Sequence, residues 1–320
     1  MAHTESTVVV AAALAANLLI AVAKFVAALF TRSSAMLAEG FHSLADTVNQ
    51  VFLLLGIKLS ARPADGKHPF GYAQERYFWA FIVAISIFTV GAAFSCYEGV
   101  HKIIHHDDPG QALKHPLWAV GVLVVGIFLE GTSWVIALRQ FLRDKGDRTT
   151  LQVLRDTRDP VLITVLFEDS AAMFGLVTAL AGLGAAWATG NMLYDGIASV
   201  VVGLVLAGVA FFLARETKDL LLGESVPEHE RQRIEELVTD FDEVSTLVAH
   251  RTMHLGPREV LAVLKVEFRD GMETGQIEAT IDRIEGRLRG ELPQLTRIWI
   301  EPGTARPAPT LPRNPGPLDP

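Results

Sequence analysis

Two pairs of ionisable side chains stand inside apolar stretches that are long enough to cross a bilayer. His42 and Asp46 lie in one of these stretches, and Glu168 and Asp169 lie in another. Ionisable groups at membrane depth are costly, so they usually face a cavity, a partner or an ion. His42 and Asp46 are four residues apart, which places them on the same face of a helix. An imidazole and a carboxylate in this arrangement can hold a divalent cation or share a proton.

The four side chains combine imidazole nitrogen with carboxylate oxygen, a donor set that suits Zn²⁺, Mn²⁺, Fe²⁺ or Co²⁺. Ligation requires a neutral imidazole and ionised carboxylates, so protons and a metal ion compete for the same groups. This competition can couple the movement of a cation to the movement of protons. The alternative is that the four groups hydrogen-bond to one another and lock the packing of two helices. Four such residues on two helices, with the His/Asp pair one turn apart, favour the ion site.

The sequence also indicates which way Glu168 and Asp169 point and identifies a further carboxylate, Glu130, in another apolar stretch. Glu168 and Asp169 are adjacent, and neighbouring residues of a helix point about 100° apart, so we expect one of the two to point at any given site. Glu130 lies near the middle of a further apolar stretch, where a carboxylate must be protonated, paired or hydrated. Lys24, in the first apolar stretch, is a candidate partner for it.

The elements that position these residues are six apolar runs of membrane length. They occupy roughly residues 8–30, 35–57, 78–103, 117–138, 160–188 and 192–214. Half of the 320 residues are hydrophobic and the mean hydropathy is +0.32, which is too apolar for a soluble protein of this size. Basic residues concentrate in the second and fourth of the loops that join these runs. By the positive-inside rule, both termini are expected in the cytoplasm and the chain in the cell (inner) membrane, multi-pass.

The character of the chain changes after Arg215. Residues 1–215 are expected to form the six-helix transmembrane domain, 216–227 a linker, and 303–320 a disordered, proline-rich tail. Between them the pattern predicts a helix at 228–238, strands at 245–254 and 260–268, a helix at 274–288 and a strand at 296–300. The expected fold class is therefore an α-helical membrane protein with a small C-terminal cytoplasmic α+β domain of order αββαβ at residues 228–302.

Several functional classes are disfavoured by what the sequence contains. The single cysteine, Cys96, excludes a disulfide framework and a thiolate metal cluster, and the net charge of −8 gives no basic surface for nucleic acid. The chain has no phosphate-binding G-x-x-x-x-G-K-[ST], no G-x-S-x-G and no H-E-x-x-H motif. We therefore expect neither an enzyme nor an organic cofactor, and a transport mechanism that does not use ATP.

Two more candidate ligands, Asp65 and His68, lie in the loop between the second and third runs, at the expected cytoplasmic mouth. They could capture metal from solution. They could equally order a turn, since Asp side chains commonly bond to nearby backbone groups in turns. Both interpretations stay open at the level of the sequence.

The chain resembles the cation diffusion facilitator family of divalent metal/proton antiporters, over nearly all of its length before the tail. The resemblance rests on the segments Ala38–Asp46, Arg62–Asp65, His68–Tyr72, Tyr97–Gly99 and Leu220–Gly223, followed by the αββαβ pattern. It implies six spans, cytoplasmic termini and a homodimer. The segment Glu75–Trp79, together with Glu-Asp in the fifth span, is similar to a divergent branch of the family.

The resemblance also implies a tetrahedral metal site, with two ligands four apart on helix 2 and two four apart on helix 5. His42 and Asp46 match the first pair. The family pattern on helix 5 is His-x-x-x-Asp; Asp169 matches its Asp, but Val165 stands at the position of the His. Glu168 is then expected as the fourth ligand or as a proton carrier, which makes the site richer in oxygen.

The sequence therefore predicts a dimeric secondary transporter that exports a divalent cation from the cytoplasm in exchange for protons. Zinc is the favoured ion, with manganese, iron or cobalt as alternatives. The competing hypothesis is a transport-inactive membrane scaffold or regulatory relative with a degenerate helix-5 site, and Val165 is the feature that supports it. The third hypothesis is a channel-like cation pathway.

Overall fold

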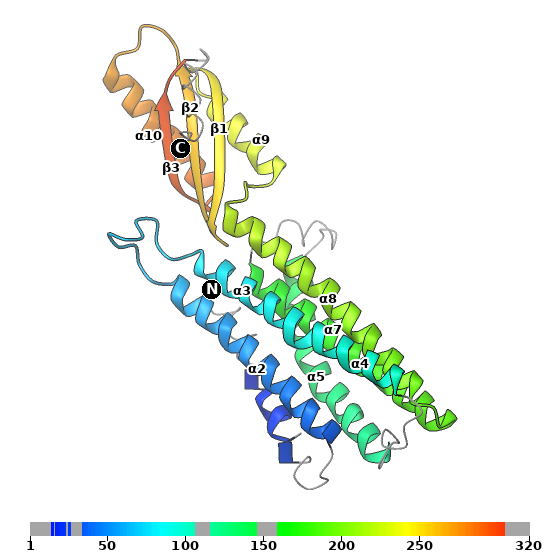
Figure 1. The fold of residues 1–320 in the computed structure, drawn as a ribbon. Coiled ribbons are helices and arrows are strands. Elements are labelled where there is room, and N and C mark those ends of the chain that lie inside the picture. The colour runs from blue at the N-terminus through cyan, green and yellow to red at the C-terminus, as the bar shows by residue number, and fades with distance from the viewer. Residues whose placement is uncertain are drawn as a thin grey trace, which may run out of the picture. The chain divides into compact units, whose positions relative to one another are not determined.

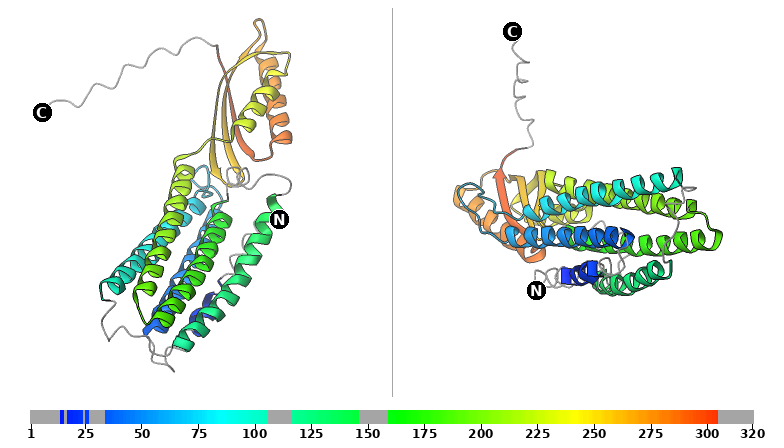
Figure 2. Two further views of the ribbon diagram at one scale, coloured as in Figure 1. Left: turned by 90° about the vertical axis from the view of Figure 1, so that its right-hand side faces the viewer. Right: turned by 60° about the horizontal axis from the view of Figure 1, so that its bottom comes forward.

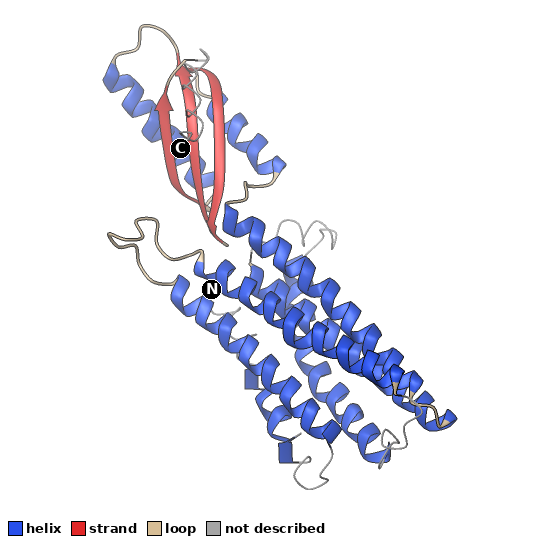
Figure 3. Ribbon diagram, viewed as in Figure 1, coloured by secondary structure: helices blue, strands red, loops and turns tan. Residues whose placement is uncertain are grey.

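The computed structural model describes residues 14–15, 17–23, 25–26, 34–105, 116–145 and 159–304, and the chain divides after Leu222 into two compact units. The described part of the first unit is helical, and the second contains a three-stranded sheet (Figure 1; Figure 3). The tail predicted to be disordered lies outside the described residues from 305 onward.

The first unit is built from long apolar helices. Its described helices are α2 (Ser34–Ser60), α3 (Glu75–Ser86), the π-helix η1 (Ile87–Ala93), α4 (Phe94–Ile104), α5 (Pro116–Lys145), α7 (Pro160–Thr189) and α8 (Leu193–Leu222). The segments α3, η1 and α4 form one continuous helical stretch, Glu75–Ile104. The third predicted span is therefore continuous, but it carries a wider π-helical turn, a feature that often marks functional positions in helices.

Helix α7, which carries Glu168 and Asp169, has well-defined ends. Asp159 Oδ1 accepts a hydrogen bond of 3.1 Å from the backbone N–H of Val161, and Pro160 occupies the first helical position. Both are favoured at a helix start, because the cap satisfies a free N–H and proline has none to satisfy. Gly190, with φ of +72°, ends the helix in the left-handed conformation that glycine adopts without strain.

Four helical segments among the described residues are long and apolar enough to cross a membrane. They are Glu75–Ile104, Ala119–Arg143, Pro160–Thr189 and Leu193–Leu222, which confirms four of the six predicted runs. Helix α2 covers the predicted run 35–57 but is not among these four, and most of the run 8–30 lies outside the described residues. A total of six spans therefore stays a prediction.

Large apolar side chains are exposed on the outer faces of the helices, as expected for helices that face lipid. Phe128, Leu204 and Phe211 are all well exposed. In water such faces would form an apolar patch prone to association. Lipid chains solvate them instead, so the first unit is that of a membrane protein with several apolar helices.

Within the first unit, α7 packs against α5 and α8, and α8 also packs against α3, η1 and α4, while α2 packs against α3 (Figure 2). Glycines allow the closest of these contacts. A Cβ on Gly99 of α4 would lie 2.7 Å from the backbone N of Val200 and 2.8 Å from the carbonyl oxygen of Gly196, both on α8. The two backbones therefore approach too closely for a larger residue at this position.

The second unit has the predicted order αββαβ. Its elements are α9 (Glu228–Thr239), β1 (Val244–Gly256), β2 (Glu259–Phe268), α10 (Thr274–Glu291) and β3 (Leu295–Pro302). The sheet order is β1-β2-β3, with β1 antiparallel to β2 and β2 parallel to β3. Figure 2 shows α9 and α10 on the same side of the sheet. Ile234 and Val238 of α9, and Ile284 of α10, form a core with the buried strand residues.

One boundary differs from the expectation. The residues 216–222, assigned to a linker, continue α8 as a helix to Leu222. The reason is that this last part still packs: Thr217 and Leu220 are buried, and the Thr217 hydroxyl donates to the carbonyl oxygen of Leu213 at 2.6 Å. The polar residues between them occupy the exposed face of the same helix.

Candidate metal site

Helix α2 carries the first predicted pair of ligands. His42 belongs to the helix, but its side chain lies outside the described residues. Asp46, one turn later, is described and lines a small cavity between the helices. The structure thus places Asp46 at this cavity, and the roles of Asp46 and His42 as metal ligands stay predictions.

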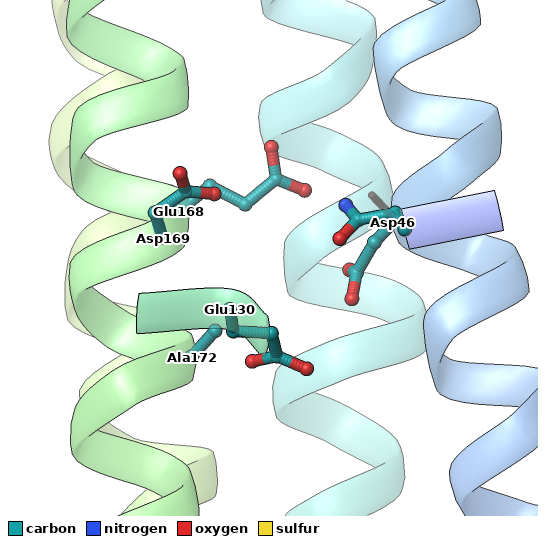
Figure 4. Close-up of a pocket in the computed structure, with 6 residues that line it drawn as sticks. Asp46, Glu130, Glu168, Asp169 and Ala172 are labelled. Carbon is teal, nitrogen blue, oxygen red and sulfur yellow. The ribbon is translucent and has the colours of Figure 1, made fainter. Parts of the chain in front are cut away.

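Helix α7 carries the second pair. Glu168 and Asp169 are both buried, with 7% and 8% of their surface exposed. Both line the same cavity as Asp46, so the expectation that one of these neighbours would point away is wrong. The longer side chain of Glu168 accounts for this, since it extends from α7 toward α2 (Figure 4). Val165, where the family pattern has a His, is 0% exposed in an apolar core.

The cavity is formed by residues from several helices. Its lining consists of Asn17, Asp46, Glu130, Glu168, Asp169 and Ala172 (Figure 4). The space between these side chains is about the size of one water molecule or one metal ion. Among the described residues, no three His, Cys, Asp or Glu side chains converge closely enough to hold one ion. The structure therefore shows a carboxylate-lined cavity and no assembled coordination sphere within that part of the chain.

Two amide side chains of α2 make hydrogen bonds at the cavity, one with Glu168 and one with Asn17. Asn49 Nδ2 donates to Glu168 Oε1 at 2.9 Å, and Asn17 Nδ2 donates to Gln50 Oε1 at 3.1 Å. Asn49 and Gln50 are both fully or almost fully buried. In the described structure Glu168 Oε2 has no hydrogen-bond partner. One oxygen of Glu168 is thus fixed by Asn49, and the other remains able to accept a proton or bind a cation.

The charge balance of this cavity points to a positive ligand. Several carboxylates in one low-dielectric space repel each other and lose the stabilisation that water gives to ions. A bound cation or bound protons relieve both costs. A metal ion and protons would be alternative ligands of such a cavity, and the competition between them stays a prediction.

Asp65 and His68 do not line this cavity; they lie in the loop between α2 and α3. Asp65 Oδ1 accepts hydrogen bonds from the backbone N–H groups of Lys67 (2.9 Å) and His68 (2.7 Å), and the Tyr72 hydroxyl donates to Asp65 Oδ2 at 2.7 Å. The hydrogen bond from Tyr72, together with that from the backbone of His68, lowers the pKa of Asp65.

The contacts of this loop support one of the two interpretations of Asp65 and His68. The His68 ring lies against Tyr72 with ring centroids 4.3 Å apart, and its Nδ1 is 3.6 Å from Asp65 Oδ1. These interactions order a turn, in keeping with the usual part of an Asp in such a loop. Metal capture by this pair stays a prediction.

The sequence alone missed the amides that line and support the cavity. Asn49 could have been found, because it lies three residues after Asp46 and so shares a face of the helix. The only sequence feature that sets Gln50 and Asn17 apart is that they are polar residues within apolar runs, which does not predict a place at the cavity. Glu130 was recognised as an unusual intramembrane carboxylate, but its place in the cavity was not anticipated; Lys24, its candidate partner, lies outside the described residues.

The fold and the site together define a helical membrane protein with a buried, carboxylate-lined cavity between its spans. The model of the cation efflux transmembrane domain matches residues 10–222 of the chain, well over half of it. The chain therefore belongs to the cation efflux, or cation diffusion facilitator, family, and the resemblance seen in its motifs is confirmed.

Individual relatives agree with this assignment. The chain is 34% identical over 270 residues to a protein of Xenopus laevis named proton-coupled zinc antiporter SLC30A9, mitochondrial, covering 82% of this chain and 47% of that protein. It is 31% identical over 269 residues to metal tolerance protein C4 of Arabidopsis thaliana, covering 82% of this chain and 57% of that protein. It is 28% identical over 292 residues to the cation-efflux pump FieF of Escherichia coli, covering 90% of this chain and 89% of that protein. The chain spans about half the length of the first two relatives.

Proposed function

We propose that this chain is a secondary transporter that moves a divalent cation out of the cytoplasm in exchange for protons. The observation that carries the proposal is the buried cavity shared by Asp46, Glu168 and Asp169, in which Glu168 Oε2 has no hydrogen-bond partner among the described residues. Zinc is the first candidate substrate, since the frog relative is named a zinc antiporter; manganese, iron and cobalt are the alternatives.

The proposed mechanism uses the competition between cation and protons. His42, Asp46 and Asp169 bind the ion, and Glu168 serves as the fourth ligand or carries a proton. When the cation binds, the carboxylates give up protons; when protons return from the other side, they displace the cation. Asp65 and His68 in the α2–α3 loop are proposed as a second pair of ligands, which would capture the metal before it reaches the cavity.

The membrane and the assembly state also belong to the proposal. Basic residues in the alternate loops support cytoplasmic termini and a multi-pass position in the cell (inner) membrane. The resemblance to the family supports a homodimer, with the C-terminal αββαβ unit in the cytoplasm.

Metal-dependent proton flux tests the proposal. The full chain is reconstituted into proteoliposomes with a pH-sensitive dye inside, and Zn²⁺ is added outside. The parent is expected to show a proton flux that depends on the metal, and D46A and D169A are expected to fall close to the background of empty vesicles.

A matched control is the variant E98Q. Glu98 also lies in a span, but it does not line the cavity. Its ion-pair partner Lys102, at 3.6 Å, keeps a closer contact with Asp195, at 3.0 Å, when Glu98 is replaced. E98Q should keep the flux of the parent. A parent without metal-dependent flux, or D46A and D169A that match the parent, would refute the proposal.

The alternative function, a transport-inactive scaffold or regulator, is supported by one observation. Val165 holds the position of the family's His and is buried in the apolar core, so it cannot ligate. Calorimetry of the purified chain with Zn²⁺ separates the two functions. Binding in the parent that D46A abolishes supports transport, and the absence of binding above background supports the scaffold.

A further inference from the structure

Helix α5 places Glu130 beside α7. Gly126, Glu130 and Trp134 are spaced four apart and therefore share one face of α5. A Cβ on Gly126 would lie 3.4 Å from Leu176 of α7, and Trp134 Nε1 donates to Ser170 Oγ of α7 at 2.9 Å. Glu130 lies between these two contacts, so its side chain is held on the face of α5 that packs against α7.

The register of these contacts sets the depth of Glu130. Because Gly126 faces Leu176 and Trp134 faces Ser170, the helices are antiparallel and Glu130 stands close to the level of Ala172 and Met173 on α7. Ala172 and Glu130 both line the cavity, as Figure 4 shows. The level of Glu130 is about one helical turn from Asp169 along α7.

The cavity that Glu130 enters already contains a group in need of a ligand. Glu168 is more than nine-tenths buried, and within the described residues its Oε2 atom accepts no hydrogen bond. A fourth carboxylate beside Asp46, Glu168 and Asp169 adds negative charge where negative charge is already expensive. Burial of these carboxylates in one cavity costs less when a cation is bound among them.

We propose that Glu130 is a cation ligand supplied by α5, and that it makes the site an oxygen-rich one for a divalent cation. This inference rests on the proposed transport function and extends it, because it draws a ligand from a third helix besides α2 and α7. Glu130 brings the oxygen donor that Val165 cannot provide. The flexible side chain of a Glu can move its carboxylate toward an ion by rotation about its own torsions.

The inference has a consequence for the choice of metal. Carboxylate oxygens suit harder ions such as Mn²⁺, whereas an imidazole nitrogen suits Zn²⁺. Replacement of a nitrogen donor by Glu130 therefore narrows the preference for Zn²⁺ over Mn²⁺. The substrate class of the site is a divalent cation that accepts a mainly oxygen coordination.

The test compares metal binding by variants of the full, detergent-solubilised chain, with Zn²⁺ alone or Mn²⁺ alone in the calorimeter. E130Q removes the charge and is expected to weaken the binding of both ions by about tenfold or more, as loss of a metal-supporting group typically does. E130H replaces oxygen by nitrogen and is expected to shift the ratio of affinities toward Zn²⁺. E98Q, the matched Glu-to-Gln control outside the cavity, should bind as the parent does.

The outcomes separate this inference from the function on which it rests. If D46A and D169A lose binding while E130Q binds like the parent, Glu130 is no ligand and the proposed function stands. If D46A and D169A bind like the parent as well, the proposed function itself fails. If E130Q does not fold, E130H decides: an unchanged ratio of Zn²⁺ to Mn²⁺ affinity overturns the inference, because a packing role would not move that ratio.

Discussion

The side chain of Glu168 is the residue on which the candidate site depends most. Glu168 extends toward α2, where Asn49 Nδ2 donates a hydrogen bond of 2.9 Å to its Oε1 atom. This hydrogen bond fixes one oxygen and leaves the other directed at the cavity. We therefore expect Asn49 to be a positioning residue, which would act on a bound ion through Glu168.

This positioning can be measured with a double-mutant cycle of N49A and E168Q. If Asn49 acts through Glu168, N49A should weaken Zn²⁺ binding in the parent and have little further effect in the E168Q background. We expect a coupling energy of about 0.5–3 kcal/mol, the range for residues in direct contact. The measurement is calorimetric Zn²⁺ titration of the four proteins, and additive effects would contradict the assigned role.

Asp65 gives a second prediction at the residue scale. Its pKa is lowered because Tyr72 and the backbone N–H groups of His68 and Lys67 donate to the ionised carboxylate. Because the pKa of Asp65 is lowered on folding, the ionised carboxylate stabilises this loop at any pH above the ordinary Asp pKa of about 3.9. This stabilisation is lost as the pH falls through the lower pKa that Asp65 has in the folded protein. In Y72F the pKa of Asp65 should rise toward its ordinary value.

Titration of the Asp65 carboxyl carbon by NMR in selectively labelled, micelle-bound protein measures this shift. R62A is a suitable comparison, since the Arg62 guanidinium lies 6.0 Å from the centre of the Tyr72 ring and is not among the described groups that lower the pKa of Asp65. A pKa of Asp65 that is the same in Y72F and the parent would show that Tyr72 does not bond to the carboxylate in solution.

At the scale of elements, the close pairing of α4 with α8 is set by glycines. A Cβ on Gly203 of α8 would lie 2.8 Å from the backbone N of Cys96 and 3.0 Å from the carbonyl oxygen of Ala92. G203A must push the helices apart and is expected to cost about 1–3 kcal/mol, the usual range for overpacking. Gly208 of the same helix has nothing within 4 Å, so G208A is the control.

The two variants are compared by thermal unfolding in detergent. G208A should match or slightly exceed the stability of the parent, because alanine is the better helix former. Equal melting temperatures for G203A and G208A would contradict the close approach of α4 and α8.

A partly buried ion pair joins the starts of α3 and α7. Arg76 is 3% exposed, its Nη1 lies 3.3 Å from Asp159 Oδ2, and its Nε donates to Ser60 Oγ of α2 at 3.2 Å. D159A removes both this carboxylate and the cap of α7. We expect a loss of about 1–3 kcal/mol, because the variant loses a hydrogen bond to a buried charged group together with the helix cap.

The control for this prediction is an exposed pair on α8. D219N removes the contact of Asp219 with Lys218 (3.2 Å), where both side chains face solvent, and should cost less than about 1 kcal/mol. Thermal unfolding of both variants provides the comparison. A D159A variant as stable as D219N would show that the Arg76 contact does not hold the helices.

The sequence predicted the elements well where periodicity and length decide them. The αββαβ order and the runs that became α5, α7 and α8 were all anticipated. It did not predict the π-helix η1, because a π-turn has no distinct hydrophobic pattern, or the extension of α8 to Leu222, because helical hydrogen bonds can continue after the apolar run ends.

At the scale of the whole molecule, the site depends on which helices become neighbours, and that information is only partly local. Spacing within α2 related His42 to Asp46, because both lie on one helix. No such spacing relates Glu130 on α5 to Glu168 on α7, since their proximity follows from interhelical contacts such as Trp134 with Ser170. The ligand-type residues could thus be predicted from the sequence, but the cavity they share could not.

The central claim is that the cavity beside Asp46 and Asp169 holds the transported cation. Anomalous scattering from crystals of the full chain soaked in Zn²⁺ tests it most directly, because it locates the ion and its ligands together. We predict an anomalous peak in the cavity, about 2.0–2.2 Å from carboxylate oxygens of Asp46 and Asp169. Crystals in which Zn²⁺ occupies other positions, such as the Asp65–His68 loop, and leaves this cavity without a peak would contradict the claim.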